Sequence, residues 1–203
     1  MKLHRTSGKP DWAQVALDRR NHFQKLAAAT HGVLTPANVI TIIGLATVVI
    51  GLAAILQTQY GTGVGFLIVG RLLDVVDGVV ADLTATKAPL GEALDASVDK
   101  VGTFLTVVVL YAAHVADWRI ITGLLLPQLV TLGIILYLRR IGKTVHPTRA
   151  GKLGMALLWV GIIGLVAVEA WAVPLLIIAT GIAIALSIMF GLFSGWQYAT
   201  GRD

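Results

Sequence analysis

Residues 39–57 read VITIIGLATVVIGLAAILQ and contain no charged side chain. A helix that crosses a lipid bilayer needs about 20 consecutive, mainly apolar residues. Five further stretches of comparable length and character follow along the chain, at 62–82, 92–114, 119–138, 152–169 and 171–195. The sequence therefore predicts an all-α, polytopic membrane protein with six transmembrane helices.

The last two apolar stretches almost touch. They meet at Glu169-Ala170-Trp171, which predicts a very tight turn at these three residues. A single helix through both stretches would be too long for one span. Pro174 suits the first turn of the helix that follows, where its missing N–H group costs nothing.

Composition supports the membrane class. The 203 residues are 56% hydrophobic and 13% charged, with a mean hydropathy of +0.81. A soluble domain has about 25% charged residues. Cysteine is absent, which excludes disulfides and thiolate metal sites, and the five histidines show no metal-ligand spacing. The net charge is +5, and the charged residues are spread unevenly along the chain. This distribution favours a membrane surface over nucleic acid as partner.

Positive charge in the short loops predicts the orientation in the membrane. Lysine and arginine are concentrated in residues 1–38 and in the loop near 139–152, whereas the opposite side has only Arg119. Both termini are therefore expected in the cytoplasm, with the chain crossing the cell membrane several times. Residues 1–38 contain no apolar run typical of a cleavable signal peptide.

The chain divides into a cytoplasmic amphipathic arm, residues 1–38, and a six-helix catalytic domain, residues 39–203. Within the arm, residues 11–30 place Trp12, Val15 and Phe23 near one helical face and charged side chains elsewhere. This pattern predicts an interfacial helix at the membrane surface. An ordinary solvated arm is the alternative.

Acidic residues are concentrated in the second and third predicted spans. Five aspartates occur between positions 74 and 99: Asp74, Asp77, Asp82, Asp95 and Asp99. Ionisable groups inside spanning helices are costly and commonly mark function. Structural ion pairing is the alternative, but the nearby cations, Arg71, Lys87 and Lys100, are too few for so many acids.

The spacing of four of these aspartates predicts that they converge. Asp74 and Asp77 are three residues apart, and Asp95 and Asp99 are four apart, so each pair lies on one helical face. In an antiparallel helical hairpin that turns near residue 86, the two pairs also lie at the same depth. Four carboxylates at one level require protonation or a cation between them. Oxygen ligands without cysteine or histidine favour Mg²⁺ or Mn²⁺.

The same residues form a recognisable pattern. Asp74-x2-Asp77-Gly78-x2-Ala81 and Gly91-x3-Asp95-x3-Asp99 resemble the signature of the CDP-alcohol phosphotransferase family, D-x2-D-G-x2-A-R-x8-G-x3-D-x3-D, at seven of its eight fixed positions. The six predicted spans, the preceding amphipathic helix and the stretch Thr35-Pro36-Ala37-Asn38 also agree with that family. The eighth position departs from the pattern, since Asp82 stands where the family has arginine beside the donor diphosphate.

The resemblance implies a reaction and a set of site residues. The reaction is transfer of a phosphatidyl or other phosphoalcohol group from a CDP-linked donor to an alcohol, with release of CMP. By position, Asp74, Asp77, Asp95 and Asp99 would hold two Mg²⁺ or Mn²⁺ ions, and Asp99 is a ligand or the general base. The nucleotide of the donor would be bound by Asn38, Thr41, Gly78, Ala81 and Gly91.

The acceptor alcohol is suggested by two shorter similarities. The run Leu90-Gly91-x2-Leu94-Asp95-x3-Asp99-Lys100 and the stretch Thr148-x2-Gly151-Lys152 resemble phosphatidylglycerophosphate synthases of the family. Arg149 and Lys152 are therefore candidate ligands for the phosphate of an acceptor such as glycerol 3-phosphate. A role as membrane-anchoring charges is the alternative for both residues.

Three functional interpretations follow. The first is synthesis of phosphatidylglycerophosphate from CDP-diacylglycerol, and the second is the same chemistry with another acceptor, such as inositol phosphate. The third is a non-enzymatic family member or an ion-handling membrane protein that uses the same acidic residues, which Asp82 in place of the family arginine keeps open. The expected partners are CDP-diacylglycerol, a phosphorylated alcohol, membrane lipid and a second copy of the chain in a homodimer, with no nucleic acid.

Overall fold

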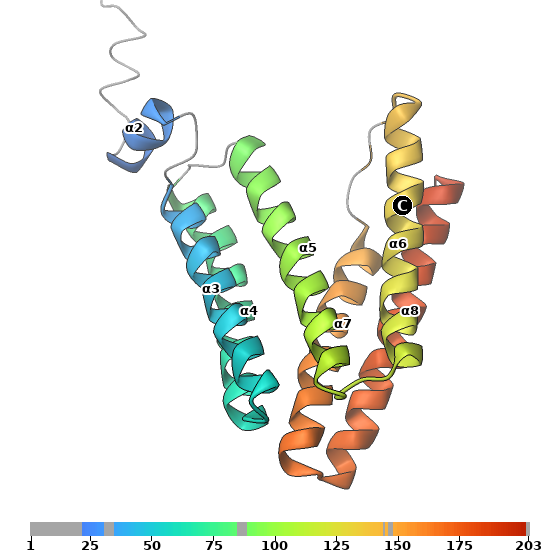
Figure 1. Cartoon of the computed structure of the whole chain (residues 1–203). Helices are drawn as coiled ribbons and strands as arrows, with labels where there is room; N and C mark the ends of the chain where they lie inside the picture. Colours follow the sequence, from blue (N-terminus) through green and yellow to red (C-terminus); the bar gives the residue numbers. More distant parts are fainter. Residues whose placement is uncertain (1–21, 31–34, 85–88, 144, 146–147, 202–203) are drawn as a thin grey trace, which may run out of the picture. The chain divides into compact units, whose positions relative to one another are not determined.

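The computed structural model describes residues 22–30, 35–84, 89–143, 145 and 148–201 (Figure 1). Every regular element in these ranges is an α-helix, which confirms the predicted all-α class. The helices are α2 (His22–Ala29), α3 (Pro36–Leu56), α4 (Tyr60–Thr84), α5 (Pro89–Ala112), α6 (Trp118–Arg140), α7 (Arg149–Trp171) and α8 (Pro174–Thr200).

The six long helices, α3 to α8, lie where the six apolar stretches predict them. Every boundary except the end of α8 lies within three residues of the expected position. The short helix α2 coincides with the last part of the helix predicted for residues 11–30. Residues 11–21 lie outside the described residues, so the interfacial helix stays a prediction.

Local chemistry at the helix ends explains the boundaries. The Asp117 carboxylate accepts hydrogen bonds from the backbone N–H groups of Arg119 and Ile120, at 3.0 and 2.9 Å, and so caps the start of α6. Thr148 caps α7 in the same way through the N–H of Gly151, at 3.0 Å. Helix α8 begins with Pro174, as predicted.

The predicted turn at residues 169–171 is wrong. Helix α7 continues through Trp171, and the chain turns at Ala172 and Val173 instead. Ala172 has a φ of 50°, and its N–H donates to the carbonyl of Val168 at 2.8 Å, which closes the helix. The break adjoins Pro174 because a residue before proline disfavours helical geometry.

Four of the helices described here are long and apolar enough to cross a membrane: α3, α6, α7 and α8. Helices α4 and α5 have 25 and 24 residues but do not meet the same standard of apolar composition. Charged residues cause this shortfall in α4, which contains Arg71 and three aspartates. The four apolar helices support the assignment of the chain as a membrane protein, whereas the number of six transmembrane helices stays a prediction.

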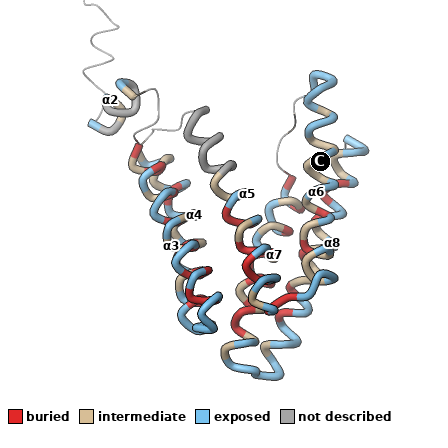
Figure 2. Tube along the Cα trace, in the orientation of Figure 1, coloured by how far each residue is buried: buried red, intermediate tan, exposed pale blue. Residues whose placement is uncertain are grey.

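The chain forms two compact units. The first comprises residues 1–46 and 70–101, and the second comprises residues 47–69 and 102–203. The core of the second unit contains fully buried apolar side chains from α3, α4, α5 and α7, among them Ile55, Leu67, Leu110 and Leu158. Figure 2 marks buried stretches of α5 and α7 in red. Helices α3 and α4 each contribute to both units, so the candidate site in the first unit lies on helices that also enter this core.

Small residues allow helices α7 and α8 to pack closely. A Cβ atom added to Gly154 would lie 3.2 Å from the backbone nitrogen of Gly191, and one added to Gly161 would lie 2.8 Å from Cγ1 of Ile184. The hydroxyl of Ser187 donates to the Gly154 carbonyl at 3.1 Å across the same contact. Such close approach through glycine and serine is typical of packing between membrane helices.

Candidate metal and nucleotide site

Asp77 is the most deeply buried of the described motif aspartates. It is 4% exposed, and its carboxylate accepts a hydrogen bond from the Thr41 hydroxyl on α3, between Oγ1 and Oδ2 at 2.5 Å. A buried carboxylate is strongly disfavoured without such a partner. Thr41, itself 5% exposed, thereby holds the Asp77 side chain in one position within the first unit.

Asn38, a second predicted nucleotide ligand, lies in the first turn of α3, three residues before Thr41. Asn38 is buried, and its backbone N–H donates to the Thr35 hydroxyl at 3.1 Å, which stabilises the start of the helix. Asn38 and Thr41 are three residues apart and therefore lie on one face of α3. The structure thus brings Thr41 to the motif directly, through Asp77.

Arg71 joins two of the other motif aspartates. Its Nη2 atom lies 3.1 Å from Oδ2 of Asp74, one helical turn further along α4. Its Nη1 atom donates to Oδ1 of Asp99 on α5 at 2.7 Å. The three side chains are about one-quarter exposed, so this ion-paired group is partly shielded from solvent. Asp74 and Asp99 therefore contact one common cation from two different helices. This agrees with the prediction that the two residues lie at the same depth along the α4 and α5 helices.

This arrangement corrects the expectation that ion pairing would play little part. The nearby cations are fewer than the acids. One guanidinium nevertheless presents several N–H donors in a fixed fork and can contact two carboxylates at once. Arg71 does so here for Asp74 and Asp99. The i, i+3 spacing of Arg71 and Asp74 was the sequence signal for this contact.

Full convergence of the four aspartates is not seen among the described side chains. No group of three or more acidic or histidine residues is placed there to hold a metal ion. Gly91 and Asp95 belong to α5, but the side chain of Asp95 lies outside the described residues. The donors that are described nevertheless suit Mg²⁺ or Mn²⁺ in type, and Arg71 shows that Asp74 and Asp99 can share a positive group.

The remaining motif positions lie on the second half of α4. Gly78 is exposed, and a Cβ atom added to it would have no described atom within 4 Å. Ala81 is partly buried and Asp82 is exposed. The face of α4 next to Asp77 is thus open at Gly78, as close approach by a ligand would require.

The predicted acceptor residues lie in the second unit, at the start of α7. Arg149 and Lys152 are both exposed and three residues apart, on the first turn of the helix. Thr148, which caps this turn, also hydrogen bonds to Ser194 of α8 between hydroxyl oxygens 2.8 Å apart. The backbone N–H of Thr148 donates to the Tyr198 hydroxyl at 3.0 Å. Contacts with α8 therefore fix the helix end that carries the two cations.

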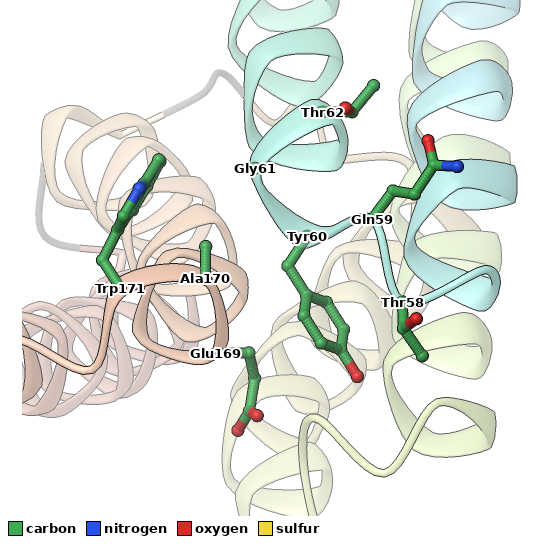
Figure 3. A pocket seen from close by; sticks show the side chains of 8 residues that line it. All are labelled: Thr58, Gln59, Tyr60, Gly61, Thr62, Glu169, Ala170 and Trp171. Atoms are coloured by element: carbon green, nitrogen blue, oxygen red, sulfur yellow. The ribbon is translucent and has the colours of Figure 1, made fainter.

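A separate pocket of about 520 Å³ lies in the second unit, where the turn between α3 and α4 and the first turn of α4 meet the last turn of α7 (Figure 3). Tyr60, Glu169 and Trp171 are among its lining residues. None of the motif aspartates belongs to the lining, which lies at the first turn of α4 rather than in its second half. This pocket is therefore distinct from the aspartate site, and nothing in the sequence predicts it.

Comparison with known families decides the assignment. The family model for CDP-alcohol phosphatidyltransferase matches residues 34–193, which is most of the chain. The chain belongs to the CDP-alcohol phosphatidyltransferase family. A comparison with individual curated proteins gave no match.

Membership of the CDP-alcohol phosphatidyltransferase family establishes the class of chemistry. The family is one of phosphotransferase enzymes and implies transfer of a phosphatidyl group from a CDP-alcohol to an alcohol. The matched region contains Asp74, Asp77, Asp95 and Asp99, and it ends before the last turns of α8. The resemblance first suggested by the aspartate pattern is confirmed at the level of the family.

Proposed function

We propose that this protein transfers the phosphatidyl group of CDP-diacylglycerol to glycerol 3-phosphate, with release of CMP. The observation that carries the proposal is the family match over a chain that keeps all four motif aspartates at their spacing. The buried pair of Thr41 and Asp77 supports it, since a buried acid is costly and commonly marks a functional site.

The proposed reaction forms one oxygen–phosphorus bond and breaks another. The acceptor hydroxyl oxygen forms a bond to the phosphorus that carries diacylglycerol. The bond from that phosphorus to the oxygen bridging the two phosphates breaks, and CMP leaves with this oxygen. Asp99 takes the proton of the attacking hydroxyl as general base.

Asp74, Asp77, Asp95 and Asp99 would hold two Mg²⁺ or Mn²⁺ ions. Such ions would supply neutralisation of the diphosphate and of the charge that develops on departing CMP. Thr41 keeps the Asp77 carboxylate in place through its hydrogen bond. Gly78 leaves room beside Asp77 for the nucleotide, which Asn38, Ala81 and Gly91 would also contact.

The direct test uses the purified protein in detergent or in lipid vesicles. CMP release is measured with CDP-diacylglycerol, Mg²⁺ and one acceptor at a time: glycerol 3-phosphate, inositol phosphate, glycerol or inositol. We expect glycerol 3-phosphate to give the fastest release together with a phosphatidylglycerophosphate product. Faster turnover with inositol phosphate would correct the acceptor alone, and no CMP release with any acceptor would contradict the proposed activity.

Arg149 and Lys152 are proposed to bind the phosphate of the acceptor. Both are exposed on the first turn of α7, where the helix dipole also favours an anion. Neutralising either residue, as Arg149→Gln or Lys152→Gln, should raise the acceptor KM by about tenfold or more, because a lost charge-assisted contact costs about 1.5–3 kcal/mol. The KM for CDP-diacylglycerol should change far less.

Arg139→Gln serves as a matched control, since Arg139 is an exposed cation in the last turn of α6. If both acceptor-site variants keep the wild-type acceptor KM, or if Arg139→Gln raises it equally, these residues act as general membrane-facing charges. Steady-state kinetics with each substrate varied in turn makes the distinction.

We further propose that α4 and α5 join the four apolar helices in the membrane, which gives six spans with both termini in the cytoplasm and a homodimeric assembly in the cell membrane. The excess of lysine and arginine in residues 1–38 and 139–152 supports this orientation. Because the chain has no cysteine, single cysteines can be introduced at Ser7 and Gln59. In intact cells a membrane-impermeant thiol reagent should label Gln59→Cys and leave Ser7→Cys unlabelled, and equal labelling would contradict the topology.

A further inference from the structure

The Arg71 ion pairs use carboxylate oxygens that the proposed metal site also needs. Arg71 contacts Asp74 and Asp99 at 3.1 and 2.7 Å, whereas the described contact of Asp77 is with the neutral hydroxyl of Thr41. Arg71 therefore places its positive charge against Asp74 and Asp99. The two it contacts come from different helices of the first unit.

Arg71 and a bound metal ion would compete at these two residues. A divalent ion binds carboxylate oxygens at close range, and a guanidinium on the same oxygens would then lie next to a like charge. Without either cation, Asp74 and Asp99 would each lose the counter-charge that Arg71 supplies, while both side chains stay only about one-quarter exposed to solvent. The Arg71 guanidinium and a metal ion therefore compete for the same oxygens of Asp74 and Asp99.

We propose that Arg71 is a built-in counter-cation that holds Asp74 and Asp99 together while the site lacks metal and withdraws from them when metal binds. The inference rests on the proposed metal site of the transferase function. It makes Arg71 a positioning residue whose release is thermodynamically coupled to metal binding. The helical hairpin of α4 and α5 thereby keeps its inter-helix contact in the metal-free protein.

The coupling makes two measurable quantities move in opposite directions when Arg71 is replaced by methionine, which is unbranched and uncharged. The metal-free protein should melt at a lower temperature, because two carboxylates lose their cation. Mn²⁺ should bind more tightly, by about five- to tenfold, because it no longer displaces an ion pair of modest strength. An arginine with only a structural role would lower the melting temperature and leave the Mn²⁺ affinity unchanged.

The experiment measures Mn²⁺ binding to purified full-length protein by electron paramagnetic resonance, and melting temperature in EDTA and in saturating Mn²⁺. Lys100→Met is the matched control, since Lys100 is an exposed cation next to Asp99 in sequence. Its loss should change Mn²⁺ affinity by less than about twofold, as expected for a solvent-screened charge. Arg71→Lys provides a second variant that retains the charge, and we expect a smaller gain in affinity from it because lysine lacks the fork that contacts two carboxylates.

The outcomes separate this inference from the proposed function. Equal or weaker Mn²⁺ binding by Arg71→Met, with wild-type protein binding Mn²⁺ normally, would overturn the counter-cation role and leave the metal site intact. A gain matched by Lys100→Met would show general electrostatics and would also overturn it. Absence of saturable Mn²⁺ binding in the wild type and in every variant would overturn both proposals. If Arg71→Met does not fold, the affinity of Arg71→Lys relative to wild type decides in the same way.

Discussion

Replacing Asp77 by asparagine should lower the turnover of the purified protein by about 10³-fold or more, because the proposed site would lose a metal ligand that stabilises several kcal/mol of developing charge. The fold should survive this change. Asparagine is nearly the same size, and its amide oxygen can still accept the hydrogen bond that Thr41 donates at 2.5 Å. The burial of the side chain is also preserved, so the expected loss falls on chemistry rather than on stability.

Asp82→Asn is the matched control for this prediction. It removes one carboxylate from the same helix, but Asp82 is exposed and lies outside the four motif aspartates. Both variants are assayed for CMP release at saturating donor and acceptor, and both are melted in detergent. Retention of more than about one-tenth of wild-type turnover by Asp77→Asn, or an equal loss in Asp82→Asn, would contradict a special role for Asp77.

Gly154→Leu should destabilise the contact between α7 and α8 by about 1–3 kcal/mol, the usual cost of overpacking a close contact. Already the first added atom, Cβ, would lie 3.2 Å from the Gly191 nitrogen and 3.4 Å from the Phe190 carbonyl carbon. These neighbours are backbone atoms, which cannot rotate away as a flexible side chain could. The hydrogen bond from Ser187 to the Gly154 carbonyl, at 3.1 Å, would be stretched by any separation of the helices.

Gly181→Leu provides the comparison on α8. Gly181 is exposed, and no described atom lies within 4 Å of a Cβ added there. Leucine at this position should leave the melting temperature unchanged or raise it slightly, because glycine is unfavourable inside a helix. Equal melting temperatures for the two variants in the same detergent would show that the α7 and α8 contact tolerates separation.

The long helices and the family could both be predicted from the amino-acid sequence. Long apolar stretches have few alternatives to helix in a bilayer, so α3 to α8 were located to within a few residues at nearly all ends. The aspartate pattern was specific because catalysis requires fixed residue types at fixed spacing, and the family match confirmed it. The function of glycines such as Gly51 and Gly161 in helix packing was also predictable, since small residues permit close approach.

The pairing of polar side chains on different helices became visible in the three-dimensional structure alone. Thr41 could be assigned to the site from sequence, but its hydrogen bond to Asp77 depends on how α3 lies against α4 across 36 positions of chain. Arg71 contacts Asp74 and Asp99 together because the packing of α4 and α5 places both carboxylates within reach of its guanidinium. The turn at Ala172 likewise required a left-handed backbone that apolar periodicity does not encode. Spacing along one helix fixes which side chains share a face, whereas contacts between helices depend on their packing.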